Sequence, residues 1–208
     1  MRTNLDPGKK VLLVGDLHGR TQWLKKLVDE QDQLVIQLGD LGFAQDYKYL
    51  ADVSSGKLLV VGGNHDEYPD IVNYPWYLGN FGLIPGFAKT FFCRGAYSVD
   101  LVDRTPGYDW WPEGELSLDG LDAFLTEYER VKPRVMLTHD CPSDILHELF
   151  GYGNIIRTRT AQAFNEAIKI HQPEFWFFGH HHKSANRLIG NTVFQCLTIG
   201  EVKEATIF

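Results

Sequence analysis

The amino-acid sequence predicts an α/β fold, and three observations support the prediction. Over the first third of the chain, short apolar runs alternate with amphipathic stretches, the rhythm of parallel strands joined by helical crossovers. The 208 residues, 44% of them hydrophobic, suit one sizeable core, so we expect a single domain over residues 1–208. Short polar clusters follow the predicted strands at their carboxyl ends, where α/β proteins bind ligands.

The first predicted elements form a β-α-β-α-β unit. Leu24, Leu27 and Val28 recur at helical spacing on one side of an otherwise polar stretch, which indicates an amphipathic helix. The expected elements are, in order, strand 11–14, helix 21–30, strand 34–38, helix 46–53 and strand 58–61.

The middle of the chain has no clear period. Residues 64–85 are rich in Pro, Gly, Tyr and Trp, and we expect an ordered loop there. Residues 91–92 and 96–102 resemble the strands of a hairpin that turns near Arg94-Gly95. The later expected elements are helix 118–130, strand 135–137, helix 142–150, helix 160–171, strand 175–178 and a closing hairpin of 192–199 with 205–208.

The composition of the chain argues against some kinds of binding partner and some cellular locations. The formal charge of −7 and pI near 5.6 disfavour extended nucleic acid as a partner. No apolar run approaches the roughly 20 residues that a membrane span needs. Met1 to Lys10 lacks the apolar core of a leader, and the three cysteines show no CxxC spacing, so we expect a cytoplasmic protein.

Five clusters of ligand-type residues lie at or just after predicted strands, and this shared position is their main signal. Carboxylate, imidazole and amide donors without thiolate suit manganese, iron or zinc. The glycines among them tolerate the sharp exit that a ligand-bearing turn needs. The clusters are Gly15-Asp16-Leu17-His18-Gly19, Gly39-Asp40, Gly62-Gly63-Asn64-His65-Asp66, Thr138-His139-Asp140 and Gly179-His180-His181-His182.

The ordered pattern D-x-H, GD, GNH-D, H, GHxH resembles the calcineurin-like metallophosphoesterases, over positions 16 to 182. The resemblance implies a four-layer αββα sandwich, in which two mixed β-sheets are flanked by helices. It also implies two divalent metal ions: we expect manganese first, with iron, zinc, nickel or cobalt as alternatives. One metal would be held by Asp16, His18 and His182, the other by Asn64, His139 and His180, and Asp40 would bridge them.

The reaction implied by the resemblance is hydrolysis of a phosphate monoester or diester. A hydroxide bridging the two metals would attack phosphorus, and His65 would protonate the leaving group as general acid. Asp40 and His65 are therefore the expected catalytic residues, and His181 is expected to point away.

The sequence departs from the phosphoprotein phosphatase branch after Asp40. The aspartate and arginine expected there are absent, so the residue that orients His65 and the arginine that binds phosphate are open. Asp66 or Asp46 are candidates for the first role. The candidates for the second are Arg20, which does match that branch, together with Arg94, Arg104, Arg157 and Arg159.

Residues 94–115 resemble small bacterial or phage members of the superfamily. Trp110 and Trp111 either form a substrate-binding lip beside the metals or cover a hydrophobic edge. Cys141 has no base near it in sequence and is expected to be a buried structural thiol, and His171 a residue on a helix face.

Other functions stay open at this stage. A nuclease or a cyclic-nucleotide phosphodiesterase of the same superfamily is the nearest alternative. A non-catalytic metal-binding scaffold is an alternative of another class, although such members lack residues that this chain keeps. A 2-His-1-carboxylate oxygenase would leave half of the clusters unexplained. The sequence does not predict an oligomeric state.

Overall fold

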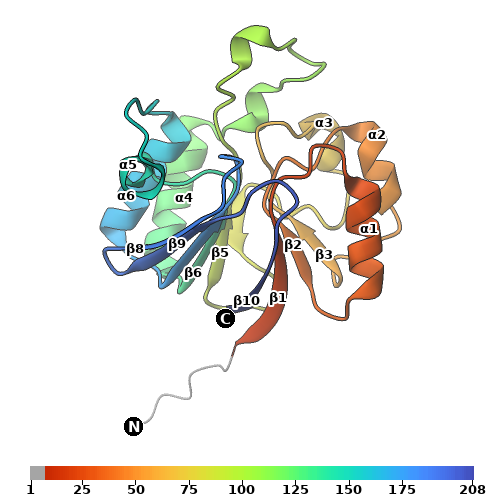
Figure 1. Ribbon diagram of the computed structural model, residues 1–208, viewed down its shortest axis with the longest axis horizontal. Coiled ribbons are helices and arrows are strands. Elements are labelled where there is room, and N and C mark those ends of the chain that lie inside the picture. Colours follow the sequence, from red (N-terminus) through yellow and green to blue (C-terminus); the bar gives the residue numbers. More distant parts are fainter. Residues whose placement is uncertain (1–7) are drawn as a thin grey trace.

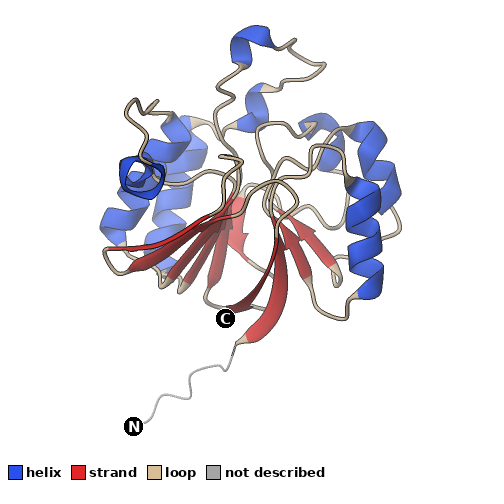
Figure 2. Ribbon diagram, in the orientation of Figure 1, coloured by secondary structure: helices blue, strands red, loops and turns tan. Residues whose placement is uncertain are grey.

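The computed structural model describes residues 8–208, and two β-sheets face each other at its centre (Figures 1 and 2). In the four-stranded sheet the order is β10-β1-β2-β3. The strands β1, β2 and β3 are parallel, and β10 pairs antiparallel with β1. Their bounds are β1 Lys9–Val14, β2 Val35–Gln37, β3 Leu58–Val60 and β10 Val202–Ile207.

The second sheet has six strands in the order β4-β5-β6-β7-β9-β8. Its inner strands β5, β6, β7 and β9 are parallel, and the edge strands β4 and β8 are antiparallel to their neighbours. The bounds are β4 Phe81–Leu83, β5 Thr90–Cys93, β6 Val135–Thr138, β7 Phe175–Phe178, β8 Ala185–Ile189 and β9 Thr192–Cys196.

Helices cover the outer face of each sheet (Figure 2). Beside the four-stranded sheet lie α1 Thr21–Glu30, α2 Ala44–Tyr47 and α3 Tyr68–Ile71, and beside the six-stranded sheet lie α4 Leu118–Val131, α5 Leu146–Phe150 and α6 Arg159–Ile170. Four 3₁₀ turns complete the elements: η1 Lys48–Leu50, η2 Leu101–Asp103, η3 Pro112–Gly114 and η4 Ser143–Ile145. The expected sandwich of two mixed sheets flanked by helices is confirmed.

Each interface between layers has its own apolar core. Leu13, Ile36 and Leu137 belong to the core shared by the two sheets, because alternate residues of each strand face inward. The other side of the four-stranded sheet packs on Leu24 and Val28 of α1, the amphipathic face that the sequence predicts. The third core lies between the six-stranded sheet and the helices α4 and α6.

Two predictions in the middle of the chain are wrong. Residues 64–85 are not all loop, since they contain α3 and β4. Residues 96–102 form no strand beside 91–92, because both edges of β5 are already paired, with β4 on one side and β6 on the other. Residues 96–102 are instead the first part of the segment 96–115, which projects above the space between the sheets (Figure 1).

The predicted closing hairpin is also wrong. β9 lies between β7 and β8, so neither of its edges is free for the last strand. The chain therefore crosses to the other sheet, where β10 pairs with the edge of β1 along its length, from Lys9 opposite Ile207 to Val14 opposite Val202.

Smaller differences concern helix ends. The expected helix 46–53 is replaced by α2 followed by η1, and 142–150 by η4 followed by α5. Within residues 8–208 no helix is both long enough and apolar enough to cross a membrane. Most of the stretch assessed for a leader, Met1 to Lys10, lies outside the described residues.

Candidate metal centre

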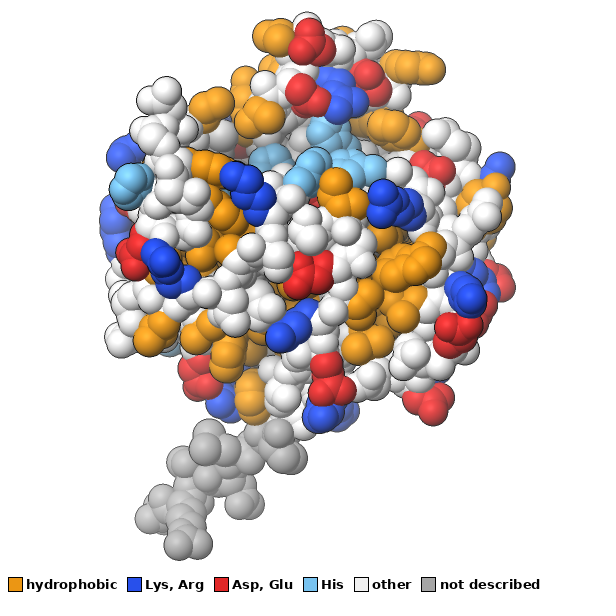
Figure 3. All heavy atoms as spheres, viewed as in Figure 1, with side chains coloured by type: hydrophobic (Ala, Val, Ile, Leu, Met, Phe, Trp, Pro, Cys, Tyr) orange, Lys and Arg blue, Asp and Glu red, His pale blue; other side chains and the backbone are white. Residues whose placement is uncertain are grey.

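The predicted ligand residues come together where the strands of both sheets end. Asp16 and His18 follow β1, Asp40 follows β2 and Asn64 follows β3. The other sheet brings His139 after β6, and His180 and His182 after β7. Histidine side chains are visible at the base of the projecting segment 96–115 (Figure 3). Both sheets therefore contribute to one site, as the sequence predicts.

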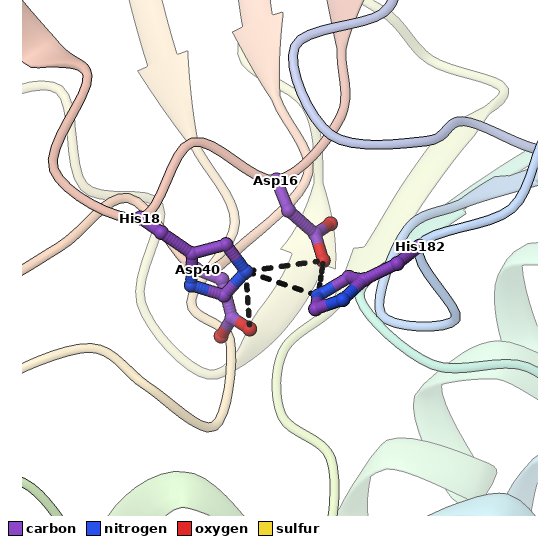
Figure 4. A group of neighbouring side chains, drawn as sticks. All are labelled: Asp16, His18, Asp40 and His182. Atoms are coloured by element: carbon purple, nitrogen blue, oxygen red, sulfur yellow. Dashed lines mark hydrogen bonds and ion pairs between the residues drawn. The ribbon is translucent and has the colours of Figure 1, made fainter.

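Asp16, His18, Asp40 and His182 form one group of potential metal donors (Figure 4). His182 Nε2 lies 3.1 Å from Asp16 Oδ2 and 3.0 Å from His18 Nε2. His18 Nε2 is 3.9 Å from Asp16 Oδ2 and also 3.9 Å from Asp40 Oδ2. These donor atoms converge on one point from three separate loops.

Asp40 also belongs to a second group, with His139 and His180. His139 Nε2 lies 3.2 Å from Asp40 Oδ1 and 3.1 Å from Asn64 Oδ1. The amide Nδ2 of Asn64 donates to Ser98 Oγ at 3.1 Å, which leaves its oxygen turned toward His139. His139 Nδ1 lies 2.7 Å from the Leu38 carbonyl oxygen, which can only accept, so Nδ1 carries a proton and Nε2 is the atom that could bind a metal.

The residues present fit divalent metal ions. Asp16 and Asp40 are almost completely buried. Within residues 8–208, Asp40 Oδ2 has no hydrogen-bond partner, and Asp16 Oδ2 faces the imidazole nitrogens of His182, at 3.1 Å, and His18, at 3.9 Å. A buried carboxylate oxygen without a partner is costly, and a cation between the donors would supply one. Imidazole nitrogen together with carboxylate oxygen is the donor set of borderline divalent metals.

Charge and burial set the protonation of the second group. Burial opposes ionisation of Asp40, but the neighbouring His139 holds the pKa of that carboxyl well below its usual range. Burial likewise opposes protonation of His139, whereas Asp40 and Asp16 raise its pKa to about 10. Burial lowers the pKa of His180 to about 4, so this imidazole is neutral and ready to bind a metal. A cation would replace the His139 proton.

The backbone at the site is held in unusual conformations. Positive φ angles occur at His18 (45°), Asp40 (57°), His180 (64°) and His182 (51°), four candidate ligands without glycine's freedom. Gly179 has no room for a side chain, because an added Cβ would lie 2.2 Å from Asp16 Oδ1.

Asp66 organises the turns that carry Asp40 and Asn64. Its buried carboxylate accepts backbone N–H bonds from Asp40 (3.2 Å), Leu41 (2.8 Å), Gly42 (3.2 Å) and Gly63 (2.7 Å). All four hydrogen bonds come from the backbone of the turns that carry Asp40 and Asn64, so the carboxylate of Asp66 stabilises these turns. Asp46 is engaged elsewhere, accepting from the Phe43 N–H at 3.0 Å.

His65 belongs to neither donor group, as expected. Its backbone N–H donates to Asp40 Oδ1 at 2.8 Å, and its Nε2 lies 3.8 Å from Asp100 Oδ1. Among the described residues, the buried atoms His65 Nδ1 and Asp100 Oδ1 have no hydrogen-bond partner, whereas Asp100 Oδ2 accepts from Arg104 Nε at 2.8 Å.

Asp100 therefore faces His65, and Asp66 and Asp46 do not. Asp100 is not among the candidates that the sequence suggests, because it lies in the irregular segment 96–115, far along the chain from His65 and outside any motif. The only available signal was its position in a stretch thought to border the metals.

The arginines that the sequence offers as phosphate ligands differ in their partners. Arg157 Nη2 lies 3.8 Å from Asp144, and Arg159 Nε lies 3.5 Å from Glu115, so both guanidinium groups are paired outside the donor groups. Arg20 forms no ion pair within residues 8–208 and stays a predicted phosphate ligand.

Two further arginines have structural partners. Arg94 is buried, donates from Nε to Asn80 Oδ1 at 2.8 Å and contacts the carbonyl of Glu113, so it ties down the end of the projecting segment. Arg104 pairs with Asp100, as described above.

Trp110 and Trp111, the residues considered as a substrate-binding lip, are placed as follows. Trp111 is buried and packs against Phe43, with ring centroids 5.7 Å apart, so it does cover a hydrophobic edge. Trp110 and Trp111 also line a cavity of about 270 Å³ together with Arg159. Their role in substrate binding stays a prediction.

His181 joins neither donor group. Its Nε2 lies 3.2 Å from Asp140 Oδ1 and 3.6 Å from the sulfur of Cys141. Cys141 is fully buried, and burial raises the pKa of its thiol well above the usual value, which fits a structural role. His171 follows α6, where its Nε2 lies 2.8 Å from the Pro133 carbonyl.

Comparison with known proteins agrees with this geometry. A family model described as calcineurin-like phosphoesterase matches residues 9–184. No curated protein matches the chain. Among solved structures, a dimetal phosphatase from Danio rerio is similar at 16% identity and a TM-score of 0.57, over 93% of this chain and 88% of that one.

Two other solved structures share the fold. The phosphopantetheinyl hydrolase from Mycobacterium tuberculosis has 13% identity and a TM-score of 0.57, over 94% of this chain and 91% of that one. A putative 5′-nucleotidase from Staphylococcus aureus has 15% identity and a TM-score of 0.53, over 94% of this chain but 50% of that one.

Proposed function

Because the chain belongs to the calcineurin-like phosphoesterase family, whose members are metal-dependent phosphoric ester hydrolases, we propose that it hydrolyses a phosphate monoester or diester at a two-metal centre. One observation carries the proposal: the two donor groups share Asp40, which offers Oδ2 to one group and Oδ1 to the other. A carboxylate that offers one oxygen to each group would suit a pair of metals about 3.5–4 Å apart.

The ligands in this proposal are those of the sequence analysis. Asp16, His18 and His182 would hold one ion, Asn64, His139 and His180 would hold the other, and Asp40 would contribute to both. We expect manganese, with iron, zinc, nickel or cobalt as alternatives. Two such cations supply a water activated near neutral pH and offset the charge of the phosphate oxygens.

The chain's own residues supply position and protons. Ser98 fixes the amide of Asn64, and the Leu38 carbonyl fixes the ring of His139. His65 is the proton donor for the leaving oxygen, since its ring adjoins the donor groups without belonging to them. Asp100 is a positioning residue that orients the His65 ring, and Arg104 holds Asp100 in place.

The test compares p-nitrophenyl phosphate with bis(p-nitrophenyl) phosphate on chelator-stripped protein, with and without added manganese. We expect metal-dependent hydrolysis, and the ratio of the two rates decides between phosphatase and phosphodiesterase. Asp40→Asn should abolish turnover of both esters, whereas Asp122→Asn, an exposed aspartate of α4, should behave as wild type. His65→Ala is assayed on phenyl phosphate, whose leaving group needs a proton. A metal-replete wild type that cleaves none of these esters contradicts the proposal.

A further inference from the structure

A second cavity, of about 290 Å³, adjoins the centre on the side of His180. It lies between residues of the projecting segment and the loop 151–158. Its floor is polar and consists of Asp140, His180 and His181. Its walls are mostly apolar or aromatic: Tyr97, Val99, Leu146, Tyr152, Ile155 and Ile156.

His180 connects this cavity to the metal centre. The same side chain belongs to the donor group of Asp40 and His139 and lines the cavity floor. A phosphate bound at a cation in that donor group would therefore have the cavity directly beside it. A substituent on the phosphate that extends past His180 enters the cavity.

The residues that line the cavity disfavour a negatively charged guest. No lysine or arginine lines the cavity, and its one carboxylate, Asp140, already accepts from the Cys141 N–H at 2.7 Å and lies 3.2 Å from His181 Nε2. An anionic guest would meet this negative charge without a counter-ion. Lys183 Nζ stands over the Tyr152 ring at 4.5 Å and Arg157 Nη2 lies 3.8 Å from Asp144, and neither cation is part of the lining.

The walls suit a flat guest. Tyr152 stacks on Phe150 with ring centroids 5.2 Å apart, so one wall is a fixed aromatic face. Val99 and Ile156 are 67% and 61% exposed at the rim, and a guest would cover both. The volume is at the small end of ligand pockets, about 300–1,000 Å³, which suits one ring system and not an extended chain.

We propose that this cavity binds an uncharged, ring-bearing alcohol portion of the phosphate ester, and so determines substrate choice. The inference rests on the proposed hydrolysis, and it adds the class of substrate: esters of neutral ring compounds, in preference to esters that carry a second anionic group on the alcohol.

The test uses three aryl esters with leaving groups of similar basicity: phenyl, 2-naphthyl and 4-carboxyphenyl phosphate, each also as its methyl diester. Wild type should prefer 2-naphthyl over phenyl by about tenfold in kcat/KM, since an added apolar group in a fitting pocket has an effect of this order. The 4-carboxyphenyl ester should be the poorest. Ile156→Lys should remove most of the naphthyl preference and improve the relative rate of the carboxyphenyl ester.

Leu188→Lys is the matched control, because Leu188 is 64% exposed on β8 and does not line the cavity. It should keep the wild-type preference. An unchanged naphthyl preference in Ile156→Lys, or a wild type that prefers the carboxyphenyl ester, overturns the inference. If no ester is cleaved, the proposed hydrolysis fails, and 2-naphthyl phosphate then becomes a stable ligand for fluorescence titration. Equal affinity of wild type and Ile156→Lys in that titration also overturns the inference.

Discussion

Replacing Asp100 by asparagine tests how protons reach the leaving group. The substitution keeps the size of the side chain and removes the charge that lies 3.8 Å from His65 Nε2. If Asp100 positions the His65 ring for proton transfer, the loss of activity should appear only in reactions that need the proton.

The magnitude follows from the geometry. Two unit charges about 4 Å apart attract by about 1 kcal/mol in water and about 4 kcal/mol at the effective dielectric near a protein surface. The side chain of Asp100 is 35% exposed and that of His65 16%, so solvent screening favours the lower end. We expect a loss of about 1–2 kcal/mol, which is about 5- to 30-fold in rate.

The assay compares kcat/KM on two esters. Phenyl phosphate has a basic leaving group and should lose activity by that factor in Asp100→Asn, whereas p-nitrophenyl phosphate should change little, because p-nitrophenolate leaves without a proton. Asp103→Asn, on the same 3₁₀ turn and exposed, is the control, and Asp100→Glu should restore part of the loss. Equal losses on both esters, or none on either, would refute a role in proton delivery.

Three further predictions concern metal binding and stability. Asp40→Asn should lower the metal bound per chain after dialysis, from two ions to one or none by elemental analysis, since it removes the charge that both groups share; unchanged stoichiometry would exclude a bridge. Gly179→Ala should weaken metal binding about 10-fold or more, because the new Cβ displaces Asp16. Calorimetric titration checks this, with Gly56→Ala as control, because an added Cβ there meets Ser54 Oγ at an ordinary contact distance of 3.7 Å. Asp66→Ala should lower the free energy of unfolding by about 3 kcal/mol, as buried N–H donors lose their acceptor; a urea midpoint equal to that of wild type would contradict this.

The sequence predicts the candidate site better than it predicts the topology. Each donor, such as Asp16 or His139, follows directly on a buried strand, and a strand, a turn and a ligand are local features that a short motif records. The helix over 21–30 was predictable for the same reason, since its apolar spacing is contained within it.

The parts that could not be predicted depend on competition between distant segments. Residues 202–207 would suit a hairpin with 192–196, but β8 and β7 occupy both edges of that strand, which becomes clear only once the sheet is assembled. Asp100 is similar, because nothing near it in sequence relates it to His65. The contact depends on the path of the segment 96–115 above the two sheets.

The positive φ angles of four candidate ligands have a consequence for the whole protein. Each such residue is held in a backbone conformation that costs about 1 kcal/mol or more, and that cost is borne whether or not a cation is present. Glycine at these positions would remove the backbone strain, but it would also remove the side chain that can bind a metal. The residues that form the site therefore lower the stability of the fold. A cation that binds only the native state shifts the folding equilibrium back toward it. A bound metal would thus stabilise the fold in addition to its proposed part in the chemistry, and we expect chelation to lower the free energy of unfolding.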